Sequence, residues 1–231
     1  MCLRILAGLV ATTALAHAAE IRGTIVIERK LTHYNVSAAA GIYQRGGAVP
    51  LGDNPEDDPI SFERAHVAIY LEGAQGESGP AKENVMEQKN RRFVPDMLVI
   101  PAGSTVSFPN SDPIFHNVFS LSKAKSFDLG NYPLGKTRDV TFLKPGIVAV
   151  YCHLHPNMAA SIVVTPNRWG TRADSDGVFS LRDIPAGTYS LVAWHKAAGT
   201  FRKRITLGDR DNLQVNFVLP YQEPSRSLAH R

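Results

Sequence analysis

Short runs of alternating apolar and polar residues, separated by glycine and proline, are the dominant pattern along this chain. Residues 64–72, 201–207 and 213–219 alternate, residues 85–93 also fit a strand, and residues 147–151 are continuously apolar. Alternation with a period of two is typical of β-strands that bury one face. Because 18 Gly and 15 Pro residues punctuate these runs, the pattern predicts an all-β protein made of short strands. It argues against helical bundles and most P-loop or doubly wound enzymes.

The composition is that of a globular protein with little excess charge. The chain has 231 residues, of which 44% are hydrophobic and 20% are charged, so disorder is not indicated. The net charge of 25 − 21 = +4 is spread along the chain, and we expect no nucleic-acid partner. The length allows one large domain or two small ones. The polar, proline-rich residues 31–61 are predicted to form a solvated loop.

The N-terminus predicts export. Residues 1–19 contain an early arginine, an apolar run over 5–15 and the small-residue end Ala16-His17-Ala18, which is the pattern of a cleaved signal peptide. Cleavage is expected after Ala18 or Ala19. The apolar run is shorter than the roughly 20 residues of a transmembrane helix, so we expect a periplasmic or otherwise exported protein with no transmembrane span. A retained membrane anchor is the alternative. Residues 221–231 are predicted to be a flexible tail.

Cleavage would remove Cys2 and leave Cys152 as the single cysteine of the mature chain. Exported proteins usually keep cysteines in disulfide pairs, so a lone thiol calls for an explanation. One explanation is an inert, buried side chain. The other is that a metal occupies the thiol.

The residues around this cysteine favour the metal. Cys152, His155 and Met158 are spaced three and three on a loop between two predicted strands, so the loop can turn all three side chains toward one point. A thiolate, an imidazole and a thioether form a soft donor set that suits copper. A trigonal copper site needs a second imidazole, and His116 is a candidate. Each residue taken alone is better explained as a loop histidine or core filler.

Residues 84–165 resemble a cupredoxin, the fold of small blue copper proteins. The matching motifs are Phe93-Val94-Pro95, Pro101-x-Gly103-x-x-Val106-x-Phe108, Phe115-His116-Asn117-Val118, and Pro145-Gly146 followed by Tyr151-Cys152. The short C-x-x-H-x-x-M loop is more similar to that of amicyanin than to the longer loop of plastocyanin. The resemblance implies a Greek-key β-sandwich with one mononuclear type 1 copper.

The resemblance also implies a role for each residue. His116, Cys152 and His155 would form the trigonal plane, and Met158 would be the long axial ligand. Asn117 would tie the two ligand loops together by hydrogen bonds. His153 departs from the usual pattern. As a neighbour of Cys152 it should point the other way, which leaves a surface histidine, a part of an electron path or a weak metal site.

A second resemblance covers the flanking segments. Residues 178–181 and 188–195, with turns at Asp176-Gly177 and Pro185-Ala186-Gly187, are similar to the carboxypeptidase regulatory-like domain, a small transthyretin-like β-sandwich. Residues 20–76 and 166–220 would form this domain discontinuously, with the cupredoxin domain inserted between them. The alternative is an extended cupredoxin followed by a separate C-terminal domain. The combination of modules is similar to methylamine utilization proteins.

Other site classes are excluded by their residue requirements. Zinc ribbons and dinuclear copper centres need more cysteines, attached haem needs C-x-x-C-H, and the common hydrolase motifs do not occur. We therefore expect a non-enzymatic, periplasmic one-electron carrier that cycles between Cu(I) and Cu(II). Its partner would be a redox protein, either a cytochrome c or a periplasmic dehydrogenase. The alternative is a copper-binding accessory protein for storage, delivery or sensing, and a metal-free interaction module is a third reading.

Overall fold

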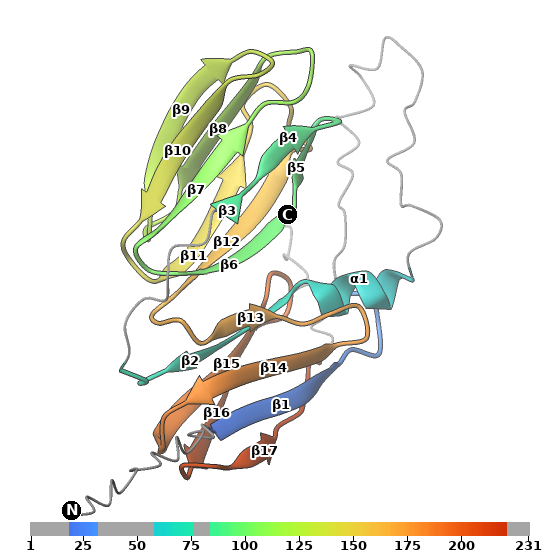
Figure 1. The fold of residues 1–231 in the computed structure, drawn as a ribbon. Helices are drawn as coiled ribbons and strands as arrows, with labels where there is room; N and C mark the ends of the chain where they lie inside the picture. Colours follow the sequence, from blue (N-terminus) through green and yellow to red (C-terminus); the bar gives the residue numbers. More distant parts are fainter. Residues whose placement is uncertain (1–18, 32–57, 76–83, 221–231) are drawn as a thin grey trace, which may run out of the picture.

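The computed structural model describes residues 19–31, 58–75 and 84–220. The expected signal peptide, apart from Ala19, and the expected tail lie outside these residues. Within them all of the regular secondary structure is β-strand except for one short helix, which confirms the predicted fold class (Figure 1). The strands form two stacked units, which we call the central sandwich (residues 84–165) and the flanking sandwich (the other described residues). In the described ranges, no helix has the length and apolar character needed to cross a membrane.

The central sandwich consists of two facing sheets and a hairpin. One sheet has the order β10-β7-β3, the other has the order β6-β12-β11-β8-β9, and β4 pairs with β5. The strands are β3 Asn84–Val85, β4 Glu87–Lys89, β5 Arg92–Val94, β6 Met97–Pro101, β7 Ser104–Pro109, β8 His116–Leu121, β9 Ser126–Tyr132, β10 Thr137–Phe142, β11 Gly146–Tyr151 and β12 Ala159–Thr165.

Alternating apolar side chains build the core between these two sheets. Phe108 and Phe142 from the smaller sheet pack in one buried cluster with Val118 and Val150 from the larger sheet. Residues 85–93, predicted as one strand, are instead interrupted twice and turn back at residues 90–91. Asn90 and Arg91 adopt φ values of 54° and 56°, and these left-handed conformations make the turn between β4 and β5.

The flanking sandwich is assembled from segments on both sides of the central one. Its sheets have the orders β14-β1-β17, with β18 also paired to β1, and β13-β2-β15-β16. The strands are β1 Ala19–Val26, β2 Val67–Glu72, β13 Gly170–Arg172, β14 Val178–Ile184, β15 Gly187–His195, β16 Gly199–Leu207, β17 Asn212–Gln214 and β18 Phe217–Val218. Ile21 lies opposite Leu181, and Leu71 lies opposite Leu191. The discontinuous domain requires such pairing, and its independent folding stays a prediction.

The turn at residues 174–177 shows why the chain reverses before β14. The side chain of Asp174 accepts hydrogen bonds from the backbone N–H groups of Asp176 and Val178 at 3.0 and 2.7 Å. Gly177 has a φ of +82°, and a Cβ atom there would lie 2.5 Å from the carbonyl oxygen of Ile25. Both the backbone conformation and the close approach to β1 therefore require glycine.

A helix occupies the end of the predicted loop. Helix α1 spans Pro59–Ala65, and its N-terminus is capped by the Asp58 side chain, which accepts from the backbone N–H of Ile60. Proline suits the first helical position because it has no N–H to leave unbonded. The expectation of a loop through residue 61 was therefore wrong for residues 59–61. The proline that suggested a loop begins a helix.

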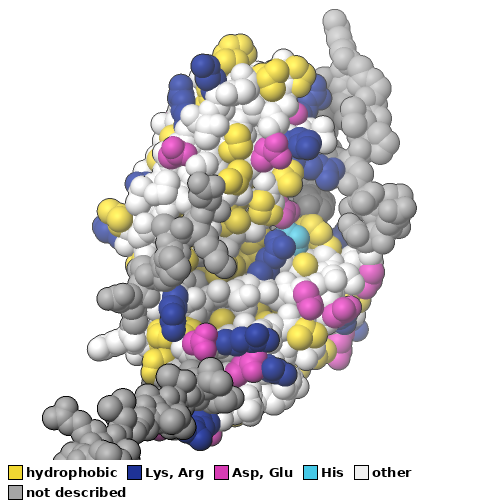
Figure 2. Space-filling model, viewed as in Figure 1, with side chains coloured by type: hydrophobic (Ala, Val, Ile, Leu, Met, Phe, Trp, Pro, Cys, Tyr) yellow, Lys and Arg dark blue, Asp and Glu magenta, His cyan; other side chains and the backbone are white. Residues whose placement is uncertain are grey.

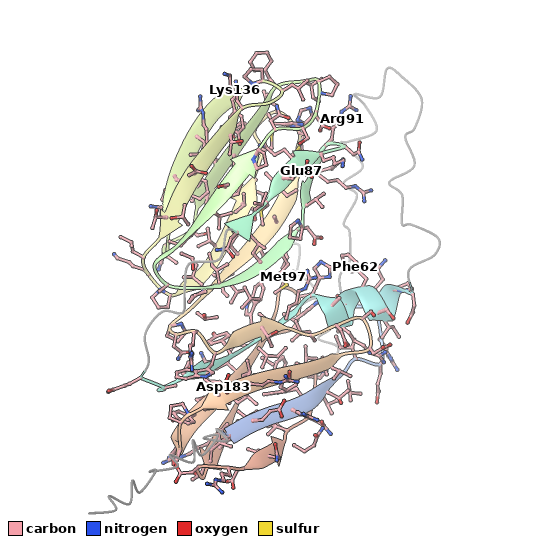
Figure 3. All side chains as sticks on the ribbon, viewed as in Figure 1. Phe62, Glu87, Arg91, Met97, Lys136 and Asp183 are labelled. Atoms are coloured by element: carbon pink, nitrogen blue, oxygen red, sulfur yellow. The ribbon has the colours of Figure 1, made fainter. Side chains whose placement is uncertain are left out.

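The five-stranded sheet of the central sandwich packs against the β13-β2-β15-β16 sheet of the flanking sandwich. Met97 and Val163 of the central sandwich form a buried cluster with Ala68 of β2, and Trp194 packs against it. Figure 3 labels Met97 and Phe62 on the two sides of this junction. Six of the seven residues of β12 are buried as a result. An ion pair crosses the junction, with His66 Nε2 lying 2.8 Å from Asp96 Oδ1.

Candidate metal centre

The predicted ligands lie on loops at one end of the central sandwich. Strand β8 begins at His116, and β11 ends immediately before Cys152. The two strands are antiparallel neighbours, so the first residue of β8 and the last residue of β11 lie at the same end of the sandwich. Residues 90–91 and 133–136 form hydrogen bonds with the β7–β8 loop at this end of the sandwich. We call residues 89–92, 110–116, 133–136 and 152–158 the histidine end of the sandwich.

Three of the four predicted ligands converge there. The Nδ1 atom of His116 lies 3.0 Å from the Nδ1 atom of His155. The Sγ atom of Cys152 lies 3.7 Å from the same His155 nitrogen, and the three atoms lie within 4.8 Å of one another. His116 and Cys152 are buried, while His155 is half-buried. Two imidazoles and a thiol therefore face one point, although His116 lies 36 residues before Cys152 in the sequence.

Asp112 sets the orientation of the buried imidazole. Its Oδ2 atom accepts a hydrogen bond from His116 Nε2 at 2.8 Å, and in the neutral ring this leaves the Nδ1 lone pair facing the other two ligands. The carboxylate also accepts the backbone N–H groups of Asn90 and Arg91 at 2.6 and 2.8 Å. Burial raises the pKa of Asp112, but these hydrogen bonds outweigh burial and hold the pKa below its usual range.

Asp112 was missed by the sequence analysis. Its one signal in the sequence is its position four residues before His116. Four residues apart is a helical spacing, whereas this segment is a loop, so nothing in the pattern indicated that the two side chains would touch.

Asn117 links the two ligand loops, as its expected role requires. Its backbone N–H donates to Cys152 Sγ at 3.4 Å. Its side-chain Oδ1 accepts the backbone N–H of His153 at 3.3 Å, and its Nδ2 donates to Asp128 at 2.7 Å. These hydrogen bonds fix the position of the sulfur relative to β8. Their influence on a bound metal stays a prediction.

Met158 lies in the core beside the thiol. Its backbone N–H donates to the carbonyl of His155 at 2.9 Å, which closes a turn. The side chain is 1% exposed and belongs to the same hydrophobic cluster as Cys152. The loop therefore places the thioether and the thiol in one buried region, and axial ligation by Met158 stays a prediction.

His155 lies at the border between this buried region and solvent. Burial, the positive charge that His116 can carry and the charge of Arg91 together lower the pKa of His155 below its ordinary value. The ring is therefore held neutral near neutral pH, which keeps a nitrogen lone pair available. Arg91 also lines a hollow of about 300 Å³, together with Asn90, Asp112, Pro113 and Ile114.

The side chain of His153 lies at the surface, apart from the three converging ligands, as was expected for the neighbour of Cys152. Its side chain is 55% exposed, and its Nε2 atom lies 3.6 Å from Asp128 Oδ2. The ring lies flat on Phe119, with 3.6 Å between centroids and 4° between planes. Among the described residues, two histidines lie outside this domain, and both make ion pairs within the protein. His66 pairs with Asp96 as described above, and His195 pairs with the buried carboxylate of Glu63 at 2.9 Å.

Residues 155–220 match the family model of the carboxypeptidase regulatory-like domain. This match confirms the resemblance for the C-terminal segment. It begins in the ligand loop and runs through β12 to the end of the flanking sandwich. No curated protein matches the chain.

Several solved structures are similar to the chain. They include the copper-containing nitrite reductase (NirK) from Thermus scotoductus SA-01, at 26% identity over 40% of this chain and 24% of that one, with a TM-score of 0.35. A purple cupredoxin from Nitrosopumilus maritimus is 23% identical over 36% of this chain and 99% of its own, with a TM-score of 0.32. A mutant amicyanin in the Cu(I) state is 18% identical over 42% of this chain and 97% of its own, with a TM-score of 0.34. The chain thus spans about a quarter of the reductase. All three TM-scores are below 0.5, so the side chains of this chain are the evidence for a metal site.

Proposed function

We propose that this protein is an exported type 1 copper protein that carries single electrons between redox proteins. The observation that supports it is the convergence of His116, Cys152 and His155 within 4.8 Å of one another. Two imidazole nitrogens and a thiol are the donors of a trigonal copper site. In this proposal Met158 is the axial ligand, and the protein holds one mononuclear copper.

The donor set fits copper better than it fits the other common metals. Structural zinc sites usually have four cysteine or histidine ligands, and calcium or magnesium requires oxygen ligands. Asp112, the acidic side chain bonded to the ligand His116, turns its carboxylate to Nε2 and not to the converging nitrogen. When bound, copper would supply a one-electron couple between Cu(I) and Cu(II).

The side chains around the ligands would keep the site rigid and dry. His116 is 0% exposed and Cys152 is 4% exposed. Asp112 fixes the ring, and the backbone N–H of Asn117 donates to the sulfur. Ligands held in place by such bonds have little freedom to rearrange when the charge of a bound metal changes. A small rearrangement is what a rapid one-electron carrier requires.

A path to partners is available at the half-buried His155. Phe115, Leu134 and Leu154 are 56%, 56% and 45% exposed at the histidine end. Figure 2 shows hydrophobic side chains at the top of the upper sandwich, next to Lys and Arg side chains. In the proposal, a redox protein such as a cytochrome c or a periplasmic dehydrogenase docks on this surface.

The decisive experiment is the visible spectrum of the protein loaded with one equivalent of copper. Thiolate-to-Cu(II) charge transfer should give an intense colour that Cys152→Ser abolishes. His153→Gln is the matched control, because His153 is adjacent in sequence but points away from the ligands. A coloured Cys152→Ser protein would contradict the proposal. Loss of copper on reduction would instead favour the alternative of copper storage or delivery.

Export is tested separately, by determining the first residue of the protein purified from the periplasm or the medium. Ala19 is 0% exposed and pairs with Ile184 as the first residue of β1. Of the two expected cleavage positions, the one after Ala18 would leave this strand complete. Mass spectrometry should therefore find a mature chain that begins at Ala19.

A further inference from the structure

Basic side chains surround the histidine end of the central sandwich. Lys89, Arg91 and Arg92 lie on the β4–β5 hairpin, Lys136 lies in the β9–β10 loop, and all four are exposed. Figure 3 shows Arg91 and Lys136 at the same end of this sandwich. The backbone N–H of Asn110 donates to the carbonyl of Lys136 at 2.9 Å, which holds that loop against the β7–β8 loop.

The acidic side chains near this end are engaged within the protein. The side chain of Asp112 is 9% exposed, and it accepts a hydrogen bond from His116. Glu87 accepts a hydrogen bond from the Ser111 hydroxyl. Asp128 accepts hydrogen bonds from Asn117 and from a backbone N–H, and it faces the ring of His153. Among the residues that the structure describes, the exposed charged side chains around the histidine end are predominantly basic, with the 57% exposed Asp128 as an acidic exception.

The hollow beside Arg91 has one cationic side chain, and the Asp112 carboxylate that also lines it is already bonded to His116 and to two backbone N–H groups. Its volume is about 300 Å³, and it lies between the β4–β5 turn and the β7–β8 loop. Arg91 provides the cationic fork that pairs with carboxylates, while Pro113 and Ile114 provide an apolar wall. The backbone N–H groups of residues 90 and 91 donate hydrogen bonds to Asp112, and these bonds hold the β4–β5 turn in place in the absence of a partner.

We propose that the histidine end docks a redox protein with an acidic contact surface, and that one of its carboxylate side chains enters the hollow and pairs with Arg91. This inference rests on the proposed electron-carrier function, since docking here brings the partner next to His155. Complementary charge accelerates encounter and selects partners more than it tightens the complex. The transfer itself moves one electron between the two proteins and forms or breaks no covalent bond.

Small charged oxidants test the sign of the charge on this surface, using the copper-loaded, reduced protein. Hexacyanoferrate(III) is an anion and tris(phenanthroline)cobalt(III) is a cation, and each takes one electron and leaves Cu(II) protein. At low ionic strength, Arg91→Gln should slow the reaction with the anion about threefold and accelerate the reaction with the cation by a similar factor. Both effects should disappear in high salt.

A matched pair of lysines provides the control. Lys136→Gln at the histidine end should act in the same direction as Arg91→Gln. Lys144→Gln makes the same change of charge in the exposed turn before β11, at the opposite end of the strand that leads to Cys152, and it should leave both rates unchanged. Equal effects of the two lysine variants, or no preference for the sign of the oxidant, would overturn the inference while leaving the electron-carrier proposal intact.

A second measurement needs no copper. Hexacyanochromate(III) is a redox-inert paramagnetic anion, and it should broaden the amide NMR signals of residues 90, 91 and 136 in the metal-free protein. Signals near residue 144 should stay sharp, and Arg91→Gln should reduce the broadening. Broadening that is absent, or located elsewhere, would refute the acidic docking surface. Because this readout is independent of the metal, failure to bind copper would affect only the proposed function.

Discussion

The carboxylate of Asp112 lies 2.8 Å from Nε2 of His116, and the two side chains are 9% and 0% exposed. The same carboxylate holds the backbone of the Asn90–Arg91 turn. One buried acid thus fixes both a predicted metal ligand and the basic rim beside it. A change at Asp112 should therefore affect both the imidazole and the proposed docking surface.

Replacing Asp112 should therefore weaken metal binding without removing a ligand. Asp112→Asn is expected to reduce copper affinity about 10- to 100-fold, because an imidazole that loses its carboxylate partner is less well oriented and less basic. Competition with a chelator measures the affinity. Asp139→Asn, on an exposed position of β10, is the control and should leave the affinity unchanged. An Asp112→Asn protein with wild-type affinity would show that the hydrogen bond does not orient a ligand.

Met158→Gln should retain copper and lower its reduction potential, because the axial residue tunes the potential of such sites. Cyclic voltammetry of the loaded protein measures the shift. Met86→Gln controls for the burial of an amide, since Met86 is also fully buried in the same core cluster. It should reduce stability but leave the potential near the wild-type value. Equal potentials for wild type and Met158→Gln would mean that Met158 is not a ligand.

The insertion hypothesis predicts how pieces of the chain fold. Removing residues 84–165 and joining the ends with a short linker should leave a folded β-domain, because β1 and β2 still find their partners in residues 166–220. Residues 166–231 alone lack those two strands and would expose unpaired edges. Circular dichroism and thermal melting compare the two. Cooperative melting of residues 166–231 as a soluble monomer would favour sequential domains instead.

The ion pair between the sandwiches should make stability depend on pH. Burial opposes a charged His66, but the hydrogen bond and charge of Asp96 outweigh it and raise the pKa of His66, although Arg172 partly opposes this. Burial also raises the pKa of Asp96, and the bond to His66 outweighs it and lowers that pKa. The stabilisation from His66 is present below its unfolded pKa and lost as pH rises through the folded one. The stabilisation from Asp96 is present above its unfolded pKa and lost as pH falls.

The pair should therefore contribute most between roughly pH 4 and 6.5, the ordinary values for the two groups. In that range Asp96→Asn should lower the free energy of unfolding by about 0.5–1 kcal/mol, with a smaller loss above pH 8. Urea melts at several pH values measure this. The exposed Asp209 gives the control Asp209→Asn, which should show no such profile. A loss that is constant with pH would mean that the charges do not interact.

Three of the candidate ligands could be predicted from the sequence because they are closely spaced. Cys152, His155 and Met158 lie within seven residues of one another, so a single loop can bring them together. The adjacency of His153 to Cys152 also predicted that its side chain would lie apart from the ligands. Even so, a hydrogen bond made through a loop, such as that of Asp112, has no periodic signal. The Asn90–Arg91 turn was also missed, because its two left-handed residues are not glycines and so do not mark a turn in the sequence.

By itself, the sequence determined the all-β class and the candidate ligands, because both follow from side-chain periodicity and from donor chemistry over short stretches of chain. Only the tertiary structure decided that Nδ1 of His116 lies 3.0 Å from Nδ1 of His155, which is 39 residues away in the sequence. It also decided that β1 pairs with β14, more than a hundred residues further along the chain. It also decided that β12 is buried on both sides, by the core and by the second sandwich. Such contacts depend on which sheet faces pack together, and the burial of apolar area that drives this packing is a property of the whole chain rather than of any local segment.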